Sequence, residues 1–232
     1  MSCLTSSNHP PMIQESTNMN IIAEIRAHTQ KVLSGIILFS HRECPRCGIY
    51  CDRFAYYDRY KRVFLVIAGN STEKAEGFLA RCICPVCAKT FTDYPNFALP
   101  FKRYVRRHMQ DKSKQYLEED NSSLEEIASR KVSGEKPPDT GYEQYLAAST
   151  LWRWTDYFGS LNCVLARARS LIRAKDPSSN IFRLPFSVSR HKYTEGERGR
   201  ILRTCLCLLK TESEYIRVFK HSFFPYFAIT NP

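Results

Sequence analysis

The sequence predicts an α+β protein in which a small β-rich module precedes a mainly α-helical region. Two C-x-x-C pairs bracket stretches rich in aromatic and β-branched residues, which is the composition of β-strands. After residue 99, apolar residues recur at helical spacing among charged ones. The predicted organisation is an N-terminal arm and helix over residues 1–35, the β module over 36–98, a helical region over 99–176 and a C-terminal helical extension over 177–232.

Composition narrows the class of protein. The 232 residues are 43% hydrophobic and 25% charged, which is ordinary for a globular chain. No apolar run approaches the roughly 20 residues that cross a bilayer, and residues 1–20 lack the basic and apolar segments of a secretory signal. We therefore expect a cytoplasmic protein without membrane contact. The formal net charge of +11 attracts polyanions at long range, and nucleic acid is the usual one.

The N-terminal half should begin with a helix over residues 19–33, where apolar residues recur at near-helical spacing. The stretches that follow have strand character, with a turn signal at residues 69–71. The expected strand segments are residues 54–60, 62–68, 78–83 and 90–92.

The C-terminal half should be built from helices that begin at capping residues. Within residues 122–126 a Ser is followed three positions later by a Glu, as in a capping box. Thr194 and Glu197 have the same spacing, and Asp176-Pro177 should end a helix. Residues 133–141 should form a loop. The expected helical segments are residues 102–119, 122 onward, 142–158 with a break near 148–149, 161–172, and a last long helix through residues 201–209.

The two C-x-x-C pairs predict a metal site. Of the ten cysteines, four are paired in this way, and such pairs in a reducing compartment bind a metal or act in redox chemistry. Pro45 and Pro85 favour tight turns between the thiols, and Gly48 allows the chain to leave the first turn. Residues 48–83 would form a β-hairpin between the pairs. We predict one structural Zn²⁺, bound in a tetrahedron by Cys44, Cys47, Cys84 and Cys87.

Alternatives to this ligand set remain open. Cys82 could replace Cys84, although the C-x-x-C spacing favours Cys84 and Cys82 should point off its strand. Cys51 and His41 lie near the pairs and could also be ligands. A site of four cysteines also suits iron.

A second dense segment spans residues 149–154, Ser-Thr-Leu-Trp-Arg-Trp. On a helix, Leu151 and Trp154 would face a core and leave Thr150 and Arg153 together on another face. A short polar and basic face of this kind suits a reader of the DNA major groove. The alternative is an ordinary helix whose tryptophans only pack.

These segments resemble an uncharacterised bacterial family that joins a transposase-type zinc ribbon to a helix-turn-helix. The resemblance covers about residues 40–160 and lies in residues 43–48, 84–92, 99–104 and 149–154. It implies a zinc-ribbon domain over 36–98 and a helix-turn-helix-like region over 99–176, in which residues 149–154 begin the recognition-type helix. By resemblance, the chain would be a DNA-binding protein of mobile-element ancestry, either a regulator or a transposase remnant.

Basic residues recur where contact with double-stranded DNA would need them. One group should form a cationic stripe on a helix that starts near residue 102, and two arginines should flank the apolar face of the helix over 161–172. The predicted DNA contacts are Lys102, Arg103, Arg106, Arg107, Ser149, Thr150, Arg153, Arg169 and Arg173.

We expect no enzymatic activity. After residue 150 the acidic residues are few and do not suggest the carboxylate cluster of a nuclease or transposase. The lone histidines, His108, His191 and His221, should be surface or packing residues. One alternative function is a zinc-stabilised protein–protein interaction module that contacts its partner through the aromatic residues 223–227. A metal-dependent nuclease or transposase is the other.

Overall fold

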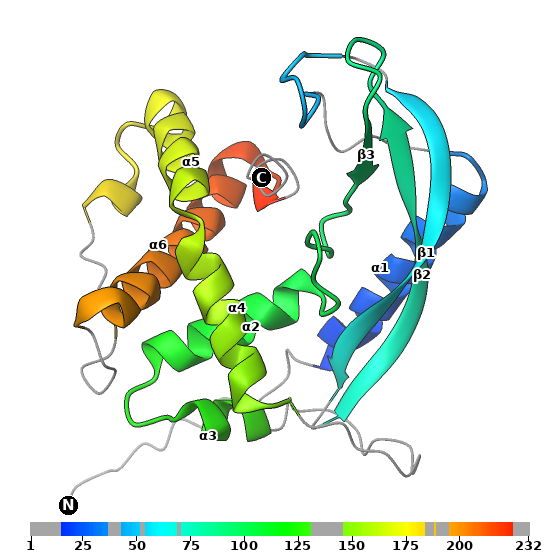
Figure 1. Ribbon diagram of the computed structural model, residues 1–232. Coiled ribbons are helices and arrows are strands. Elements are labelled where there is room, and N and C mark those ends of the chain that lie inside the picture. The colour runs from blue at the N-terminus through cyan, green and yellow to red at the C-terminus, as the bar shows by residue number, and fades with distance from the viewer. Residues whose placement is uncertain are drawn as a thin grey trace, which may run out of the picture.

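The computed structural model describes residues 15–36, 43–51, 54–68, 71–130, 146–183, 188 and 195–224, with side chains from residue 21. A three-stranded antiparallel sheet of order β1-β2-β3 stands beside a group of helices (Figure 1). The predicted α+β class is therefore confirmed. The elements are α1 (Glu15–Leu33), β1 (Ala55–Ala68), β2 (Ser71–Ile83), β3 (Thr90–Asp93), α2 (Arg106–Glu118), α3 (Leu124–Ser129), α4 (Ala148–Ser160), α5 (Asn162–Lys175), the 3-10 helix η1 (Asn180–Phe182) and α6 (Gly196–Phe219).

The predicted hairpin between the cysteine pairs is present as β1 and β2. The pairing runs from Ala55 opposite Ile83 to Ala68 opposite Ser71. The two segments expected at 54–60 and 62–68 form one continuous strand. β2 begins well before the expected residue 78, because its first residues are polar and lie in a partly exposed ribbon that apolar patterning does not reveal. The turn residues 69–70 lie outside the described residues.

Helix α1 covers one face of the hairpin. Ile25 on α1 and Phe64 on β1 are almost fully buried in a shared cluster. Gly77 allows this close approach, since a Cβ there would lie 3.0 Å from both the Phe64 side chain and Thr29 Oγ1. The Phe78 N–H also donates to Thr29 Oγ1 at 3.2 Å. The expected N-terminal helix is thus present and forms a layer that packs against the sheet.

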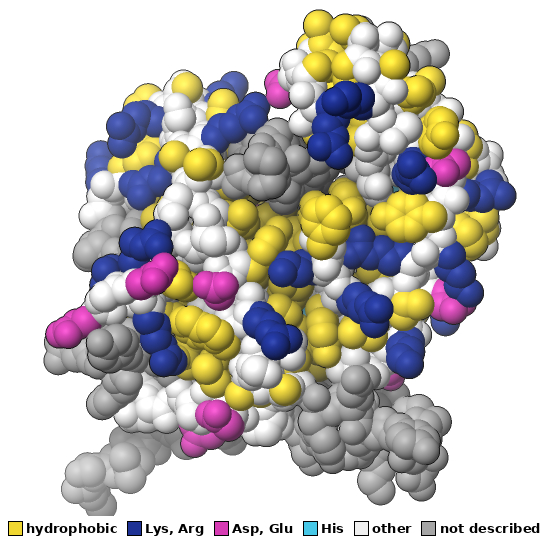
Figure 2. All heavy atoms as spheres, in the orientation of Figure 1, with side chains coloured by type: hydrophobic (Ala, Val, Ile, Leu, Met, Phe, Trp, Pro, Cys, Tyr) yellow, Lys and Arg dark blue, Asp and Glu magenta, His cyan; other side chains and the backbone are white. Residues whose placement is uncertain are grey.

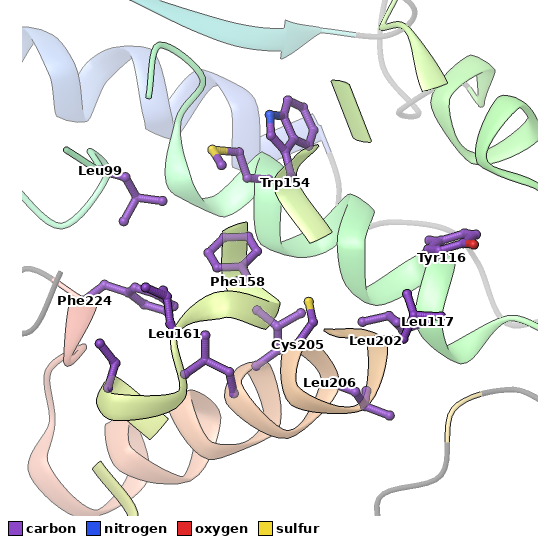
Figure 3. Close-up of a cluster of buried hydrophobic side chains, with 14 of the residues drawn as sticks. Leu99, Tyr116, Leu117, Trp154, Phe158, Leu161, Leu202, Cys205, Leu206 and Phe224 are labelled. Atoms are coloured by element: carbon purple, nitrogen blue, oxygen red, sulfur yellow. The ribbon is translucent and has the colours of Figure 1, made fainter. Parts of the chain in front are cut away.

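The helices share a larger core, centred on α4 and α6. Trp154 and Phe158 of α4 belong to one buried cluster with Leu202 and Leu206 of α6, and Figure 3 shows Phe158 near Cys205 of α6. Leu151 and Trp154 are buried, so the predicted inward face of this helix is confirmed. Among the described helices, none has both the length and the apolar character needed to cross a membrane.

Two helix starts test the capping predictions. Ser123 caps α3: its Oγ accepts the Glu126 N–H at 3.1 Å, while the Glu126 carboxylate accepts the Ser123 N–H at 2.7 Å. The capping box expected there is confirmed. The second expected box involves Thr194, which lies outside the described residues; the structure gives Glu195 as the N-cap of α6, without a side-chain capping bond.

The start of α2 also differs from expectation. The helix begins at Arg106, because the preceding residues extend the edge of the sheet. The Leu65 N–H donates to the Arg103 carbonyl oxygen at 2.9 Å, and the Val105 N–H donates to the Leu65 oxygen at 3.1 Å. Tyr104 therefore lies parallel to β1.

Candidate metal centre and basic surface

The two C-x-x-C segments fold into matching turns, which we call the first and second knuckles (residues 44–48 and 84–88). The Gly48 N–H donates to the Cys44 carbonyl oxygen at 2.8 Å, and the Ala88 N–H donates to the Cys84 oxygen at 3.0 Å. Gly48 and Ala88 both leave their turns with a positive φ, +70° and +55°. The second knuckle reaches this geometry without a glycine. The tight turns were therefore predicted correctly by the spacing of prolines and cysteines.

The knuckles bring four sulfur atoms together. The ligand atoms of Cys44, Cys47, Cys84 and Cys87 all lie within 4.8 Å of one another. Two pairs across the knuckles, Cys44 with Cys87 and Cys47 with Cys84, have sulfur atoms 3.8 Å apart. A tetrahedron with metal–sulfur bonds of about 2.3 Å has edges of about 3.8 Å. The donor set and its spacing therefore fit one tetrahedral metal ion, and the predicted cluster is confirmed.

The backbone of the second knuckle favours a thiolate. The N–H groups of Cys87 and Val86 point to the Cys84 sulfur and lower the pKa of Cys84 to about 7. Burial raises the pKa of Cys44 to about 12, although the Arg46 N–H lies 3.4 Å from its sulfur. A bound cation would displace the protons of the thiols, so metal affinity should fall as pH falls.

The neighbouring cysteines have other surroundings. Cys82 is fully buried beside Phe54 and Phe91, whose rings meet edge to face at 4.9 Å. Burial raises the pKa of Cys82 to about 12, as expected of an apolar packing residue. Cys84, not Cys82, belongs to the sulfur cluster. Cys51 packs against the same apolar cluster and is not part of the four-sulfur group. His41 lies outside the described residues.

The cationic stripe expected over residues 102–107 does not exist on one helix, because α2 begins at Arg106. The Arg106 side chain is also directed inward. It pairs with Glu212 of α6, and the two side chains are only 12% and 7% exposed. It further binds Ser222 and donates to the Asn96 carbonyl oxygen at 2.6 Å. Arg106 is therefore a structural residue and not a surface contact.

Another part of the expected DNA surface is brought together beside α4. Lys102 Nζ lies 4.3 Å from the centre of the Tyr157 ring. Burial lowers the pKa of Lys102, and the charge of Asp156 acts in the opposite direction. Arg153 is exposed one helical turn before Tyr157. Ser149 is exposed and Thr150 is half-buried in the first turn of α4, and Arg103 and Arg107 are also exposed.

The basic residues of α5 form a separate group. The guanidinium carbons of Arg169 and Arg173 lie 5.6 Å and 4.6 Å from the centre of the Phe182 ring. Arg167, which sequence reasoning missed, pairs with Glu43 beside the first knuckle at 3.2 Å. The only sequence signal for it was the run of arginines in a segment without acidic residues. This contact joins α5 to the candidate metal centre.

The connections of α4 differ from a standard helix-turn-helix. Residues 130–147 separate it from α3, and Leu161 alone joins it to α5, capping both helices. Neither connection is the three- or four-residue turn of that motif. The apolar face of α4 packs into the core of the helices. The helix-turn-helix therefore stays a prediction.

The aromatic C-terminal segment is used for packing where the structure describes it. Phe223 and Phe224 are fully buried, and their rings lie 5.4 Å and 5.6 Å from those of Tyr215 and Phe158. The protein's own core covers these two phenylalanines, so they are not available for the partner contact of the alternative function. Residues 225–227 lie outside the described residues. Of the two alternatives for His108, surface or packing, the structure shows packing, because this histidine is buried.

One face of the molecule combines cationic and apolar side chains. Figure 2 shows that Lys and Arg predominate over Asp and Glu on this face, with apolar side chains between them near its middle.

No family model matches the chain, and neither curated proteins nor solved structures yield a match.

Proposed function

We propose that the chain is a non-enzymatic DNA-binding protein whose knuckles form a ribbon-type module around one structural zinc ion. The observation that carries this proposal is the group of four sulfur atoms within 4.8 Å. All four positions of a tetrahedron would be filled by the protein, which leaves no open position for substrate. The zinc would therefore hold the fold and would not catalyse a reaction.

The DNA-binding part of the proposal is supported by charge and exposure. The net charge is +11, and α5 carries basic residues without a single acidic one. Within the described part of the chain, the Arg103 and Arg153 side chains are exposed and lie outside every ion pair. Arrays of cations of this kind neutralise phosphates. The proposed contacts are Lys102, Arg103, Arg107, Arg153, Arg169 and Arg173, and Arg106 is excluded.

Elemental analysis of the purified protein tests the metal. We expect about one zinc per chain, lost in Cys44→Ser and Cys87→Ser variants because a hydroxyl is a poor zinc ligand. Cys163→Ser is the matched control, since this cysteine is exposed on α5 and should leave the zinc unchanged. Iron in place of zinc, visible as strong thiolate-to-metal absorption, would contradict the proposed ion. Full zinc retention in both knuckle variants would contradict the ligand set.

Binding to a labelled DNA duplex tests the second part. If all six proposed residues neutralise phosphates, the logarithm of the association constant should fall with the logarithm of salt concentration with a slope of about −5. Arg153→Gln and Arg173→Gln should each reduce this slope by about 1. Arg26→Gln, an exposed substitution on α1, should leave it unchanged. Absence of binding at low salt would refute the DNA-binding proposal.

A further inference from the structure

Phe101 combines two features that a stable fold does not require. Its side chain is 95% exposed, more than any other large apolar residue that the structure describes. Its backbone also has a φ of +60°. A bulky side chain at positive φ is a strained choice, and the site would accept glycine more easily. A strained residue that makes no packing contact points to a function.

The turn that carries Phe101 is firmly held. The Lys102 N–H donates to the Leu99 carbonyl oxygen at 3.3 Å and closes a four-residue turn with proline second and positive φ third, as in a type II turn. Leu99 and Pro100 are buried. The Arg62 guanidinium reaches from β1 and donates to the Leu99 oxygen at 3.1 Å and to the Lys102 oxygen. The phenyl ring is therefore presented to solvent from a fixed base.

Cationic residues lie close to Phe101 along the chain. Lys102 and Arg103 follow it directly, and Arg107 is exposed at the start of α2. Lys102 also contacts Tyr157, which places the turn beside the α4 face that carries Arg153. An aromatic side chain close to cations matches a nucleic acid, which offers base faces for stacking between phosphates. A membrane surface would need several exposed apolar side chains, but the neighbours Leu99 and Pro100 are buried.

We propose that Phe101 is a wedge that stacks on, or inserts between, the bases of the DNA that the nearby cations bind. This inference rests on the DNA-binding function proposed above. Proteins that insert an apolar side chain at a base step partly unstack it and bend the duplex. The free energy of unstacking is offset by the new contacts between ring and bases.

The experiment compares the wild type with Phe101→Gly and Phe101→Ala on a duplex that contains 2-aminopurine, a base whose fluorescence rises when it unstacks. The wild type should raise the fluorescence, and both variants should not. Affinity should fall by roughly 5- to 100-fold, the loss seen when a stacking aromatic is truncated. Phe101→Gly should have a melting temperature equal to or above that of the wild type, since glycine relieves the positive φ. Arg153→Gln should weaken binding but keep the fluorescence rise at saturation.

The outcomes separate this inference from the proposed function. Tight wild-type binding without a fluorescence change, together with unchanged affinity of Phe101→Gly, would overturn the wedge and leave DNA binding intact. A lack of any binding by the wild type would overturn both. A lower melting temperature for Phe101→Gly would show that the ring serves the fold. Phe101-dependent sedimentation with vesicles of phosphatidylserine, without DNA binding, would identify a membrane as the occupant and refute the wedge.

Discussion

His108 shows how a single buried side chain can link the two halves of the molecule. It lies in the first turns of α2, and its Nδ1 accepts the Ile67 N–H of β1 at 2.8 Å. The ring must be neutral to accept this bond at Nδ1. Burial and, to a smaller extent, the charges of Arg107 and Lys112 lower the pKa of His108 to about 4. His108, expected to be a surface or packing residue, is therefore a buried hydrogen-bond acceptor for the sheet edge.

This lowered pKa predicts a loss of stability in acid. The unfolded chain takes up the proton near pH 6.5, before the folded protein does. Stability should therefore fall as pH falls from about 6.5 to about 4, by up to about 3 kcal/mol from this residue. In urea unfolding at pH 7 and pH 5, the wild type should lose more stability on acidification than His108→Asn, which keeps an acceptor without titrating. Equal losses in the two proteins would show that His108 does not titrate as stated.

At the scale of helices, the crossing of α4 over α6 depends on Gly159. A Cβ at this position would lie 2.5 Å from the Ile201 carbonyl oxygen and 2.6 Å from its Cγ2. Gly159→Ala should therefore destabilise the fold by about 1–3 kcal/mol, because α4 must move away from α6. Helix propensity alone predicts that the variant gains about 1 kcal/mol of stability. The sign of the measured change therefore shows which effect is larger. Thermal unfolding measures it, and Ser160→Ala, an exposed neighbour, is the control. A stabilised Gly159→Ala variant would show that α4 and α6 are not packed as closely as this contact requires.

Elements with local signals were predictable from the sequence. The knuckles depend on short cysteine and proline spacings, and the capping box at Ser123 is complete within four residues. The inward face of α4 followed from the spacing of Leu151 and Trp154, because a helical stripe needs only local periodicity.

Elements shaped by distant partners were not predictable in this way. Arg106 has the local pattern of a surface cation, yet its partner Glu212 lies on the last helix. Residues 103–105 looked helix-permissive, but hydrogen bonds to Leu65 hold them along the sheet edge. In both cases a tertiary contact overrides the local preference, and one sequence does not reveal which distant residue will meet which.

At the scale of the whole molecule, the described residues form three apolar clusters of unequal size. The largest joins the helices, the second lies between α1 and the sheet, and the smallest surrounds the knuckles. The packing of α1 on Phe64 and Leu79 gives the middle of the hairpin a core of its own. Only the knuckle end should then depend strongly on the proposed zinc ion.

Removal of the proposed zinc ion should consequently unfold the knuckle end of the molecule and leave the rest folded. After treatment with a strong chelator, hydrogen exchange measured by mass spectrometry should accelerate at the knuckles and β3, because the small cluster around Phe54 and Phe91 cannot hold four unligated thiols together. Peptides from α4, α6 and the strand centres at Phe64 and Leu79 should keep their protection. Added zinc should restore protection at the knuckles, and added magnesium should not, since thiolates are poor magnesium ligands. Uniform loss of protection would show a single cooperative unit, and unchanged exchange would show that the knuckles hold their shape without an ion.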